Sequence, residues 1–329
     1  MEPKPQKIRM ADIAKLAGVS YSAVSAVLSK SGRGKIRVGK AARERICRIA
    51  EELHYQPNMA ASILAGGSSK LIGVFIDSFS SYRTMRLLQE IEKVSSSLGY
   101  RIITSFTHDN ISHMKEDYLM LQRYGVAGFI CCAHDYPDLK DEVAELFAGA
   151  KNVVFMEKPP VPDMPYVRTS RVKAMTMMIA DACRKGYRRF GAVHRYHTAL
   201  SERTLREEFI QALRSNNLSP DENLIFESPK STDDPKSRLG LAMEKMILPF
   251  RPDFLFIDDA VSAATLWNML SRAGMDIAVY GGNNDPLFAD IDLKSLDPCY
   301  KKIAAALLDL LLHPECRTEI PLIEAVYRN

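Results

Sequence analysis

Apolar residues near the start of the chain recur at helical spacing in two short runs, residues 10–17 and 21–28. The two apolar stripes are Ile13, Leu16 and Ala17, then Val24, Val27 and Leu28. Gly18 between them can end the first helix in a left-handed conformation, and Ser20 can cap the second through its hydroxyl. Two helices joined by so short a turn predict a helix-turn-helix, whose second helix enters the major groove of DNA. A corner between two helices of an ordinary core is the alternative interpretation.

A third helix is expected over residues 40–54, because apolar residues recur there on one face. That face consists of Ala42, Ile46, Ile49, Ala50 and Leu53. Residues 31–40 before it form a glycine-rich basic loop that suits contacts with phosphates, although a solvated loop would have the same composition. The sequence thus predicts a compact unit of three helices.

The charge of this N-terminal part favours nucleic acid as its partner. The first 70 residues hold 13 Lys and Arg against 5 Asp and Glu, whereas the other 259 hold 31 against 35. A basic head on a mildly acidic body is typical of a protein that binds a polyanion. The Ala- and Gly-rich helices lack the large amphipathic face that a membrane surface requires. Double-stranded DNA is therefore the expected partner, and no membrane is expected.

Residues 57–68 form a separate segment. Pro57 ends the preceding helix, Asn58 can cap a short new one, and Gly66 and Gly67 end it. Seven helical residues are too few to be stable alone in water. The segment is expected to form a helix only when something holds it.

From residue 70 onward, apolar runs typical of strands alternate with helical patterns. The expected strands are 71–76, 101–106, 127–132, 152–156, 188–193, 253–257 and 277–280. The expected helices are 83–98, 112–123, 138–148, 171–185, 201–215, 236–246, 259–273 and 300–313. Near-continuous apolar strands between helices predict parallel sheets that are covered on both faces. The fold class is α/β, with two doubly wound subdomains in the body.

Several of these motifs together resemble the LacI/GalR family of bacterial transcription regulators. The motifs are VSYSAVSAVL, YQPN, the small-residue helix that ends at Leu64 and Ala65, and LIGVFI. The resemblance implies a periplasmic-binding-protein-like body whose chain crosses between subdomains near 166, 296 and 320. The implied domains are a helix-turn-helix domain (1–57), a hinge helix and linker (58–68) and a body (69–329). In the body, one subdomain is about 69–166 plus 297–320 and the other about 167–296 plus 321–329.

The expected DNA contacts lie on the recognition helix, the basic loop and the hinge helix. They are Ser20, Tyr21, Ser22, Ser25, Ala26, Arg33, Lys35, Arg37, Asn58, Ala61 and Leu64. The resemblance places Tyr21 and Ser22 at base edges and makes Leu64 a wedge in the minor groove. It also implies Thr and Arg where this chain has Ala23 and Ala26, so base readout is expected to be weaker or shifted.

The expected effector contacts follow the strands, because ligands of open α/β sheets bind beyond the carboxyl ends. They are Ser78, Ser80, Tyr82, His134, Glu157, Lys158, Thr169, His194, Arg195, Arg203, Asp258, Asp259 and Asn283. Each of them, taken singly, is more often a solvated loop residue than a ligand contact. By resemblance, Thr169 and Asn283 stand at positions of usual carboxylates, which removes acceptors for sugar hydroxyls. The basic residues near the cleft are compatible with a phosphorylated or acidic effector.

The remaining signals exclude other classes of protein. The six cysteines have no ligand spacing, and Cys131 and Cys132 fall in an expected buried strand, so reduced thiols and no metal are expected. No nucleophile motif, phosphate loop or zinc motif occurs, so neither an enzyme nor a cofactor is expected. The sequence predicts a cytoplasmic, homodimeric repressor of a palindromic operator, modulated by a sugar, sugar phosphate or other small metabolite. The alternatives are a solute-binding protein or a ligand sensor with only non-specific DNA affinity; an α/β enzyme with an added helical domain is the third class.

Overall fold

The computed structural model describes most of the chain and divides it into two compact units. The described residues are 8–28, 37–56, 69–76, 82–106, 110–133, 139–194, 205–228, 234–286, 288, 291, 293–316 and 319–328. One unit comprises Met1–Lys70 with Leu121–Ala127, and the other comprises Leu71–Met120 with Gly128–Asn329. The two units are described separately below.

The N-terminal unit contains the three predicted helices. They are α1 (Met10–Ala17), α2 (Tyr21–Leu28) and α3 (Lys40–Glu52). Ile13, Val24 and Ile46, one from each helix, are completely buried and form the centre of the small core. The prediction for Leu16 is wrong: it is 62% exposed, because the buried stripe of α1 runs through Ala14 instead.

The turn between α1 and α2 has the predicted caps. Gly18 ends α1 in the left-handed region, with φ of 62°. The Ser20 hydroxyl accepts a hydrogen bond from the Ala23 backbone N–H at 3.2 Å. At the start of α1, the Asp12 carboxylate accepts from the Arg9 backbone N–H at 2.8 Å. These bonds satisfy backbone donors that the first turn of a helix leaves without partners.

Replacement of Gly18 by alanine is expected to destabilise the α1–α2 turn by about 1 kcal/mol, since the left-handed region is costly for a residue with a Cβ. A Cβ at Gly18 would meet no atom within 4 Å, so the penalty is purely conformational. Gly39 is the matched control, because it has φ of −61° and equally open space. Hydrogen exchange of peptides covering residues 10–28 should be faster in Gly18→Ala and not in Gly39→Ala. Equal exchange in both variants would contradict this account.

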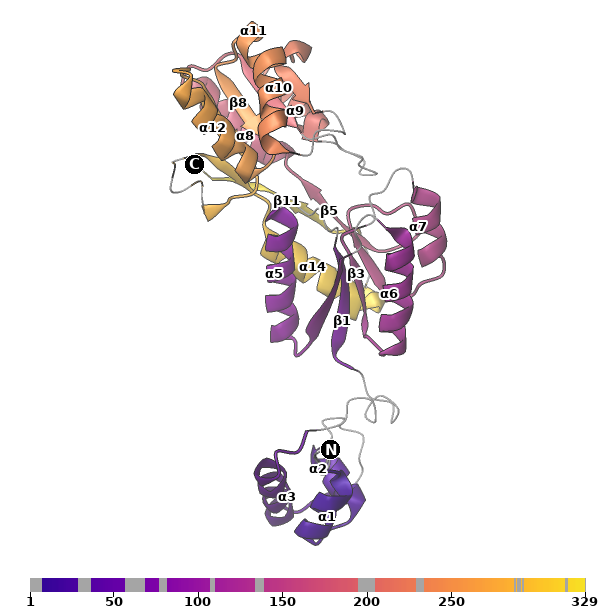
Figure 1. The fold of residues 1–329 in the computed structure, drawn as a ribbon. Helices are drawn as coiled ribbons and strands as arrows, with labels where there is room; N and C mark the ends of the chain where they lie inside the picture. The colour runs from indigo at the N-terminus through magenta and orange to yellow at the C-terminus, as the bar shows by residue number, and fades with distance from the viewer. Residues whose placement is uncertain are drawn as a thin grey trace, which may run out of the picture. The chain divides into compact units, whose positions relative to one another are not determined.

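The first subdomain of the body is a parallel sheet with helices on both faces (Figure 1). Its strands are β1 (Leu71–Ile76), β2 (Arg101–Phe106), β3 (Gly128–Cys131), β4 (Val153–Met156), β5 (Tyr166–Ser170) and β11 (Leu322–Glu324). Its helices are α5 (Tyr82–Ser97), α6 (Ile111–Arg123), α7 (Lys140–Phe147) and α14 (Tyr300–Leu312). Helices α5 and α14 share one core with the sheet. On the other side, Tyr118 of α6 and Phe147 of α7 pack edge to face around Phe75 and Phe129.

The second subdomain repeats this design. Its strands are β6 (Phe190–His194), β7 (Ile225–Glu227), β8 (Phe254–Ile257), β9 (Ala278–Gly281), β10 (Ser295–Asp297) and β12 (Val326–Arg328). Its helices are α8 (Val172–Arg184), α9 (Leu205–Ser215), α10 (Pro235–Ala242), α11 (Leu248–Phe250) and α12 (Ala260–Arg272). Two cores lie against the sheet, one formed with α8 and α9 and the other with α10 and α12. Where one helix was expected over 236–246, α10 ends at Ala242 and a π-helical turn follows at Met243–Ile247.

The two sheets have the same strand order. It is β11-β5-β4-β3-β1-β2 in the first and β12-β10-β9-β8-β6-β7 in the second. All described pairs are parallel except β10 with β12. In such doubly wound sheets the order reverses beside the first strand, and the crevice beyond its carboxyl end is the usual place for ligands.

The chain passes between the subdomains after Ser170, between Asp297 and Tyr300, and at Ala325. The expected crossings were near 166, 296 and 320. Pairing with the first sheet places 167–170 and 322–324 in the first subdomain. These short edge strands mix polar and apolar residues, so they lack the apolar runs that identified the central strands.

The described residues can also be examined for membrane-spanning helices and for clusters of metal ligands. There, no single helix is long and apolar enough to cross a membrane, and α1 with α2 meets those criteria only as a pair bent by 112°. The described residues include no group of three or more His, Cys, Asp or Glu side chains that could hold a metal ion. Burial raises the pKa of the Cys132 thiol to about 12, and that of Cys131 further, which keeps both protonated and unreactive.

Candidate DNA-binding and effector sites

The recognition helix α2 exposes its first turn. Tyr21 is 58% exposed and Ser22 is also exposed, whereas Val24 is completely buried. Ser25 and Ala26 are half-buried. Val24 fixes the rotation of α2 on its core, so the first turn is free to meet a base edge or a phosphate.

Tyr55, which follows α3, lies close to Tyr21 and was not singled out from the sequence. Burial and the nearby Tyr21 raise the pKa of the Tyr55 phenol. Tyr55 packs against the core of the three helices and so supports the start of α2 from behind. A single tyrosine just after a helix does not extend the helical spacing of apolar residues. The apolar pattern of the sequence therefore does not identify Tyr55.

The same unit also exposes several basic residues. Arg37 is exposed just before α3, and Arg43, Arg45 and Arg48 are exposed along α3. Guanidinium groups at such positions can bind phosphates, which fixes the register of a protein on DNA but carries no sequence information. The other expected DNA contacts, namely Arg33, Lys35, Asn58, Ala61 and Leu64, lie outside the described residues.

In the body, polar residues gather at the carboxyl ends of the strands. Glu157 directly follows β4, Asp258 directly follows β8, and Asn283 lies two residues beyond β9. Glu157 and Asn283 have φ of 67° and 82°, a region that residues with a Cβ seldom occupy. Backbone strain of this kind is found at ligand sites more often than elsewhere.

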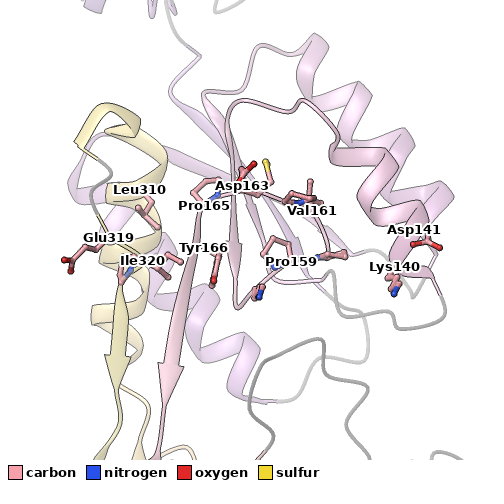
Figure 2. A pocket seen from close by; sticks show the side chains of 15 residues that line it. Lys140, Asp141, Pro159, Val161, Asp163, Pro165, Tyr166, Leu310, Glu319 and Ile320 are labelled. Atoms are coloured by element: carbon pink, nitrogen blue, oxygen red, sulfur yellow. The ribbon is translucent and has the colours of Figure 1, made fainter.

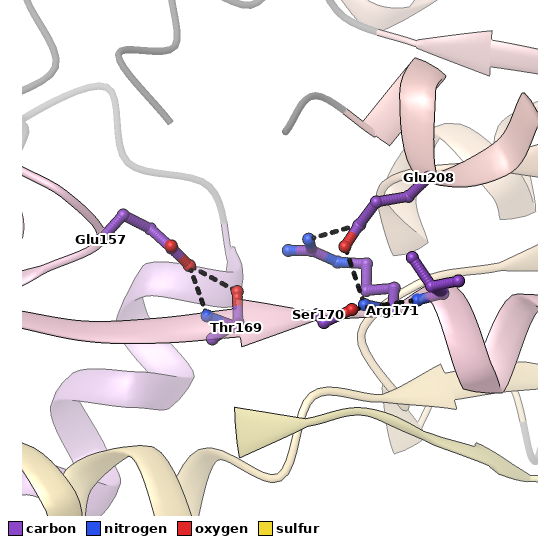
Figure 3. A network of polar contacts seen from close by, with 6 residues as sticks. Glu157, Thr169, Ser170, Arg171 and Glu208 are labelled. Atoms are coloured by element: carbon purple, nitrogen blue, oxygen red, sulfur yellow. Dashed lines mark hydrogen bonds and ion pairs between the residues drawn. The ribbon is translucent and has the colours of Figure 1, made fainter. Parts of the chain in front are cut away.

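Two carboxylates hold the end of β5, where the chain first passes between the subdomains (Figure 3). Glu157 accepts hydrogen bonds from the Thr169 backbone N–H at 3.2 Å and from the Thr169 hydroxyl. Glu208 of α9 accepts from the Arg171 backbone N–H at 2.9 Å and pairs with the Arg171 guanidinium at 3.2 Å. Burial raises the pKa of the Glu157 carboxyl, although Thr169, Arg171 and Arg83 oppose that effect.

The first turns of α5 and α14 lie at the same end of the first sheet. Arg83 of α5 interacts electrostatically with Arg171, Tyr300, Asp258 and Glu157. Burial, and after it the like charge of Arg171, lowers the pKa of the Arg83 guanidinium. Burial raises the pKa of the Tyr300 phenol to about 12. A neutral tyrosine and several guanidinium groups therefore share this region with the carboxylates.

Tyr300 also connects the subdomains. Its hydroxyl donates a long hydrogen bond of 3.4 Å to the Asn283 Oδ1, and the Asn283 amide donates to the Asp258 backbone oxygen at 3.1 Å. Asn283 was expected to contact an effector, and the structure places it beside the crossing between β10 and α14.

Two other expected contacts have structural partners of their own. Asp259 caps α12 by accepting from the Ser262 backbone N–H at 2.8 Å, and it pairs with the buried Arg238 at 3.2 Å. His194 is only 2% exposed at the end of β6, where its ring lies near Phe209 and Phe256. The His194 ring is thus packed among aromatic side chains of the second subdomain.

Lys158, the residue after Glu157, lines an open pocket of about 800 Å³ on the first subdomain. Figure 2 shows this pocket. The pocket is lined by residues 158–166, Lys140, Asp141, Leu310 and 319–321. Four of the residues in 158–166 are prolines, and proline fixes its own backbone, so the loop is stiff. The pocket lies beside the start of β5, whereas Glu157 and Arg171 lie at the carboxyl ends.

Several expected effector contacts fall outside the described residues. These are Ser78, Ser80, His134, Arg195 and Arg203. Tyr82 begins α5, and its side chain is not described.

Comparisons with known proteins agree with this arrangement. Residues 9–58 match the family model of bacterial regulatory proteins of the lacI family. The sucrose operon repressor of Klebsiella pneumoniae is 31% identical over 183 residues, which cover 54% of this chain. The matched part spans about half of that relative's length, 52%.

Solved structures show the same fold along nearly the whole chain. The lac repressor dimer bound to operator and the anti-inducer ONPF has a TM-score of 0.79 at 19% identity, covering 99% of this chain and 98% of that one. A complex of the transcriptional regulator CelR with cellobiose has a TM-score of 0.64 at 17% identity, covering 98% of both chains.

The fold and the two sites define a class of protein: a helix-turn-helix domain joined to a body of two periplasmic-binding-protein-like subdomains. Its residues 9–58 are similar to the helix-turn-helix domain of lacI-family regulators, and its fold is that of the lac repressor along nearly the whole chain.

Proposed function

We propose that this protein is a transcriptional repressor that binds a palindromic DNA operator as a homodimer and responds to a small-molecule effector. The single observation that carries the proposal is the exposed first turn of α2, fixed by the buried Val24 in a unit whose α3 also exposes three arginines. A surface that combines base-reading and phosphate-binding groups suits specific DNA recognition rather than transport or catalysis. The protein acts in the cytoplasm, where its operator lies.

The DNA contacts expected from the sequence remain part of the proposal. Tyr21 and Ser22 read base edges, Ser25 and Arg37 contact phosphates, and Leu64 enters the minor groove from each subunit of the dimer. Two subunits then bind two half-sites related by a two-fold axis. The family relatives named above are repressors, which favours repression over activation.

The effector acts where the chain passes between the subdomains. Thr169 lies at the first crossing, Arg171 interacts with Arg83 of the first subdomain and Glu208 of the second, and Tyr300 of α14 is bonded to Asn283 of the second. A ligand that changes these contacts changes the angle between the subdomains and thereby the operator affinity. Such a coupling free energy is typically about 1–3 kcal/mol and is reciprocal between operator and effector.

The proposal is tested by selecting binding sites from a random pool of DNA duplexes with the full-length protein. We expect a palindromic site and a linear fall of log affinity with log salt concentration. In Tyr21→Ala, affinity for the selected site should fall by about tenfold or more and base preference in each half-site should relax, because one direct base contact is lost.

Met177→Ala is the matched control, because Met177 is a large side chain of the body with an exposure of 60%, close to that of Tyr21. It should bind the selected site as the unchanged protein does. If binding depends on salt but no DNA sequence is enriched, the proposal of a sequence-specific repressor is rejected. The protein would then be a ligand sensor whose basic N-terminal domain binds DNA non-specifically.

A further inference from the structure

Helix α5 presents two arginines at the ligand-binding end of the first sheet. It begins at Tyr82, shortly after β1 ends at Ile76, and β1 lies between β2 and β3, where the strand order reverses. Arg83 occupies the first turn of α5 and Arg86 the next. The topology therefore places both guanidinium groups beyond the carboxyl end of the strand where doubly wound sheets bind ligands.

Within the described part of the chain, neither arginine has an acceptor that accounts for its position. Among the described residues, no hydrogen bond or ion pair reaches the guanidinium of Arg83 or that of Arg86. The Nε atom of Arg86 is buried without an acceptor. A guanidinium is charged at any physiological pH, and burying an unpaired charge is costly. A sequence that retains two such groups side by side on one helix favours an acceptor from outside the chain.

The charged groups that face these arginines are already engaged or too distant to pair. Arg171 is neutralised by Glu208, and Glu157 holds the end of β5 through Thr169. Asp258 interacts with Arg83 but makes no ion pair with it within 4.0 Å. On the α14 side, Asp297 pairs with Arg328 at 2.8 Å. The carboxylates of the described residues in this region thus make no ion pair with Arg83 or Arg86.

We propose that the effector carries an anionic group, phosphoryl or carboxylate, and that Arg83 and Arg86 bind this group together. The inference rests on the proposed function, since it names the ligand class of the effector site. Guanidinium groups suit this chemistry because their planar donors bind two oxygens of one anion at once.

The same arrangement explains how an anion would move the subdomains. Arg83 belongs to the first subdomain, and Arg171 is bonded to α9 of the second. Burial lowers the pKa of Arg83 most, and the like charge of Arg171 lowers it further, so the two charges repel each other. An anion bound by Arg83 and Arg86 reduces this repulsion and lets the subdomains approach.

Calorimetric titration of the full-length protein tests the proposal, with inorganic phosphate, malonate and glucose as probes at constant ionic strength. Phosphate or malonate should bind in preference to chloride, and their relative affinities identify the phosphoryl or the carboxylate group. Arg83→Gln and Arg86→Gln should each weaken binding of the preferred anion by about tenfold or more, because each removes a charged donor. Arg86→Lys keeps the positive charge but loses the planar pair of donors that a guanidinium offers. Its affinity for the anion should therefore lie between those of the unchanged protein and Arg86→Gln.

Lys93→Gln is the matched control. It removes one positive charge from the same helix at its exposed end, where Lys93 pairs only with Glu90. It should bind the anion as the unchanged protein does. Equal weakening in Lys93→Gln and Arg86→Gln would mean a general effect of net charge and would overturn the proposal.

Thermal unfolding without any added anion separates a ligand-binding role from a structural one. A guanidinium without a partner contributes no bond to the fold, so Arg86→Gln should unfold at the same temperature as the unchanged protein or higher. A clear fall in unfolding temperature would show that Arg86 is structural and would overturn the proposal.

The selection of DNA sites keeps the two proposals distinguishable. If the unchanged protein selects a palindromic site but binds no probe anion better than chloride, the anion site is rejected and the repressor stands. If it binds phosphate or malonate through Arg83 and Arg86 but selects no site, the anion site stands and the specific repressor is rejected.

Discussion

Replacement of Ile46 by alanine should unfold the helix-turn-helix domain and abolish operator binding. Ile46 of α3 is completely buried and packs with Ile13 and Val24 at the centre of the three helices. Removing a buried isoleucine side chain to Cβ costs about 3 kcal/mol, because apolar contacts are lost and a cavity remains. A domain of about 50 residues has a free energy of unfolding of only a few kcal/mol, so little stability would be left.

Two readouts on the full-length protein separate the domain from the body. Affinity for the selected site should be lost, whereas the fluorescence of Trp267, the only tryptophan, should follow an unchanged unfolding of the body. Trp267 lies in α12 of the second subdomain. Leu16→Ala is the control for an apolar truncation in the same domain, because Leu16 is 62% exposed and should cost less than about 0.5 kcal/mol. Similar losses in both variants would contradict this description of the core.

The helix-turn-helix was the part of the fold that the sequence predicted best. Caps at Gly18 and Ser20 and a strict apolar spacing act locally, so they can be identified without the rest of the chain. Leu16 shows the limit of this reasoning. Ala14 and Leu16 both lie near the edge of an apolar stripe, and only the position of α3 decides which of them is buried.

In the body, buried central strands were predictable and edge strands were not. β1, β3 and β8 are continuous apolar runs, because helices cover both of their faces. β5, β11 and β12 are short and contain charged residues, since one edge or face meets water. β11 pairs with β5, more than a hundred positions away, and β12 pairs with β10 across the whole of α14, and no local pattern contains either pairing.

The effector site stays a prediction, but the positions of its residues can be compared with the fold. The rule that ligands bind beyond strand ends directs attention to Glu157 and Asn283, and the structure places both just beyond strands. It does not find Arg83, Arg86 or Glu208, because they lie within helices, where a charged residue is ordinarily solvated. Their burial becomes visible only when α5 and α9 are packed on their sheets.

Replacement of Glu208 by alanine should destabilise the body by about 3 kcal/mol, because it leaves a charge without its partner in a protected site. Glu208 has a side-chain exposure of 1% and its partner Arg171 of 18%. The alanine variant loses the acceptor for both the Arg171 guanidinium and the Arg171 backbone N–H. Urea unfolding followed by Trp267 fluorescence measures the loss. Glu208→Gln keeps an acceptor oxygen for the backbone N–H and should lose less.

The exposed pair Arg206 and Glu222 provides the matched control for this ion pair. Glu222 begins the short 3₁₀ turn before β7 with a side-chain exposure of 67%, and Arg206 is 36% exposed. Water screens such a pair, so Glu222→Ala should cost at most about 0.5 kcal/mol. If Glu222→Ala and Glu208→Ala were equally destabilising, burial would not be what makes the Glu208 contact strong. Because Glu208 also fixes the first residue after β5, its loss should in addition weaken the effect of a bound anion on operator affinity, which links the stability of this crossing to regulation.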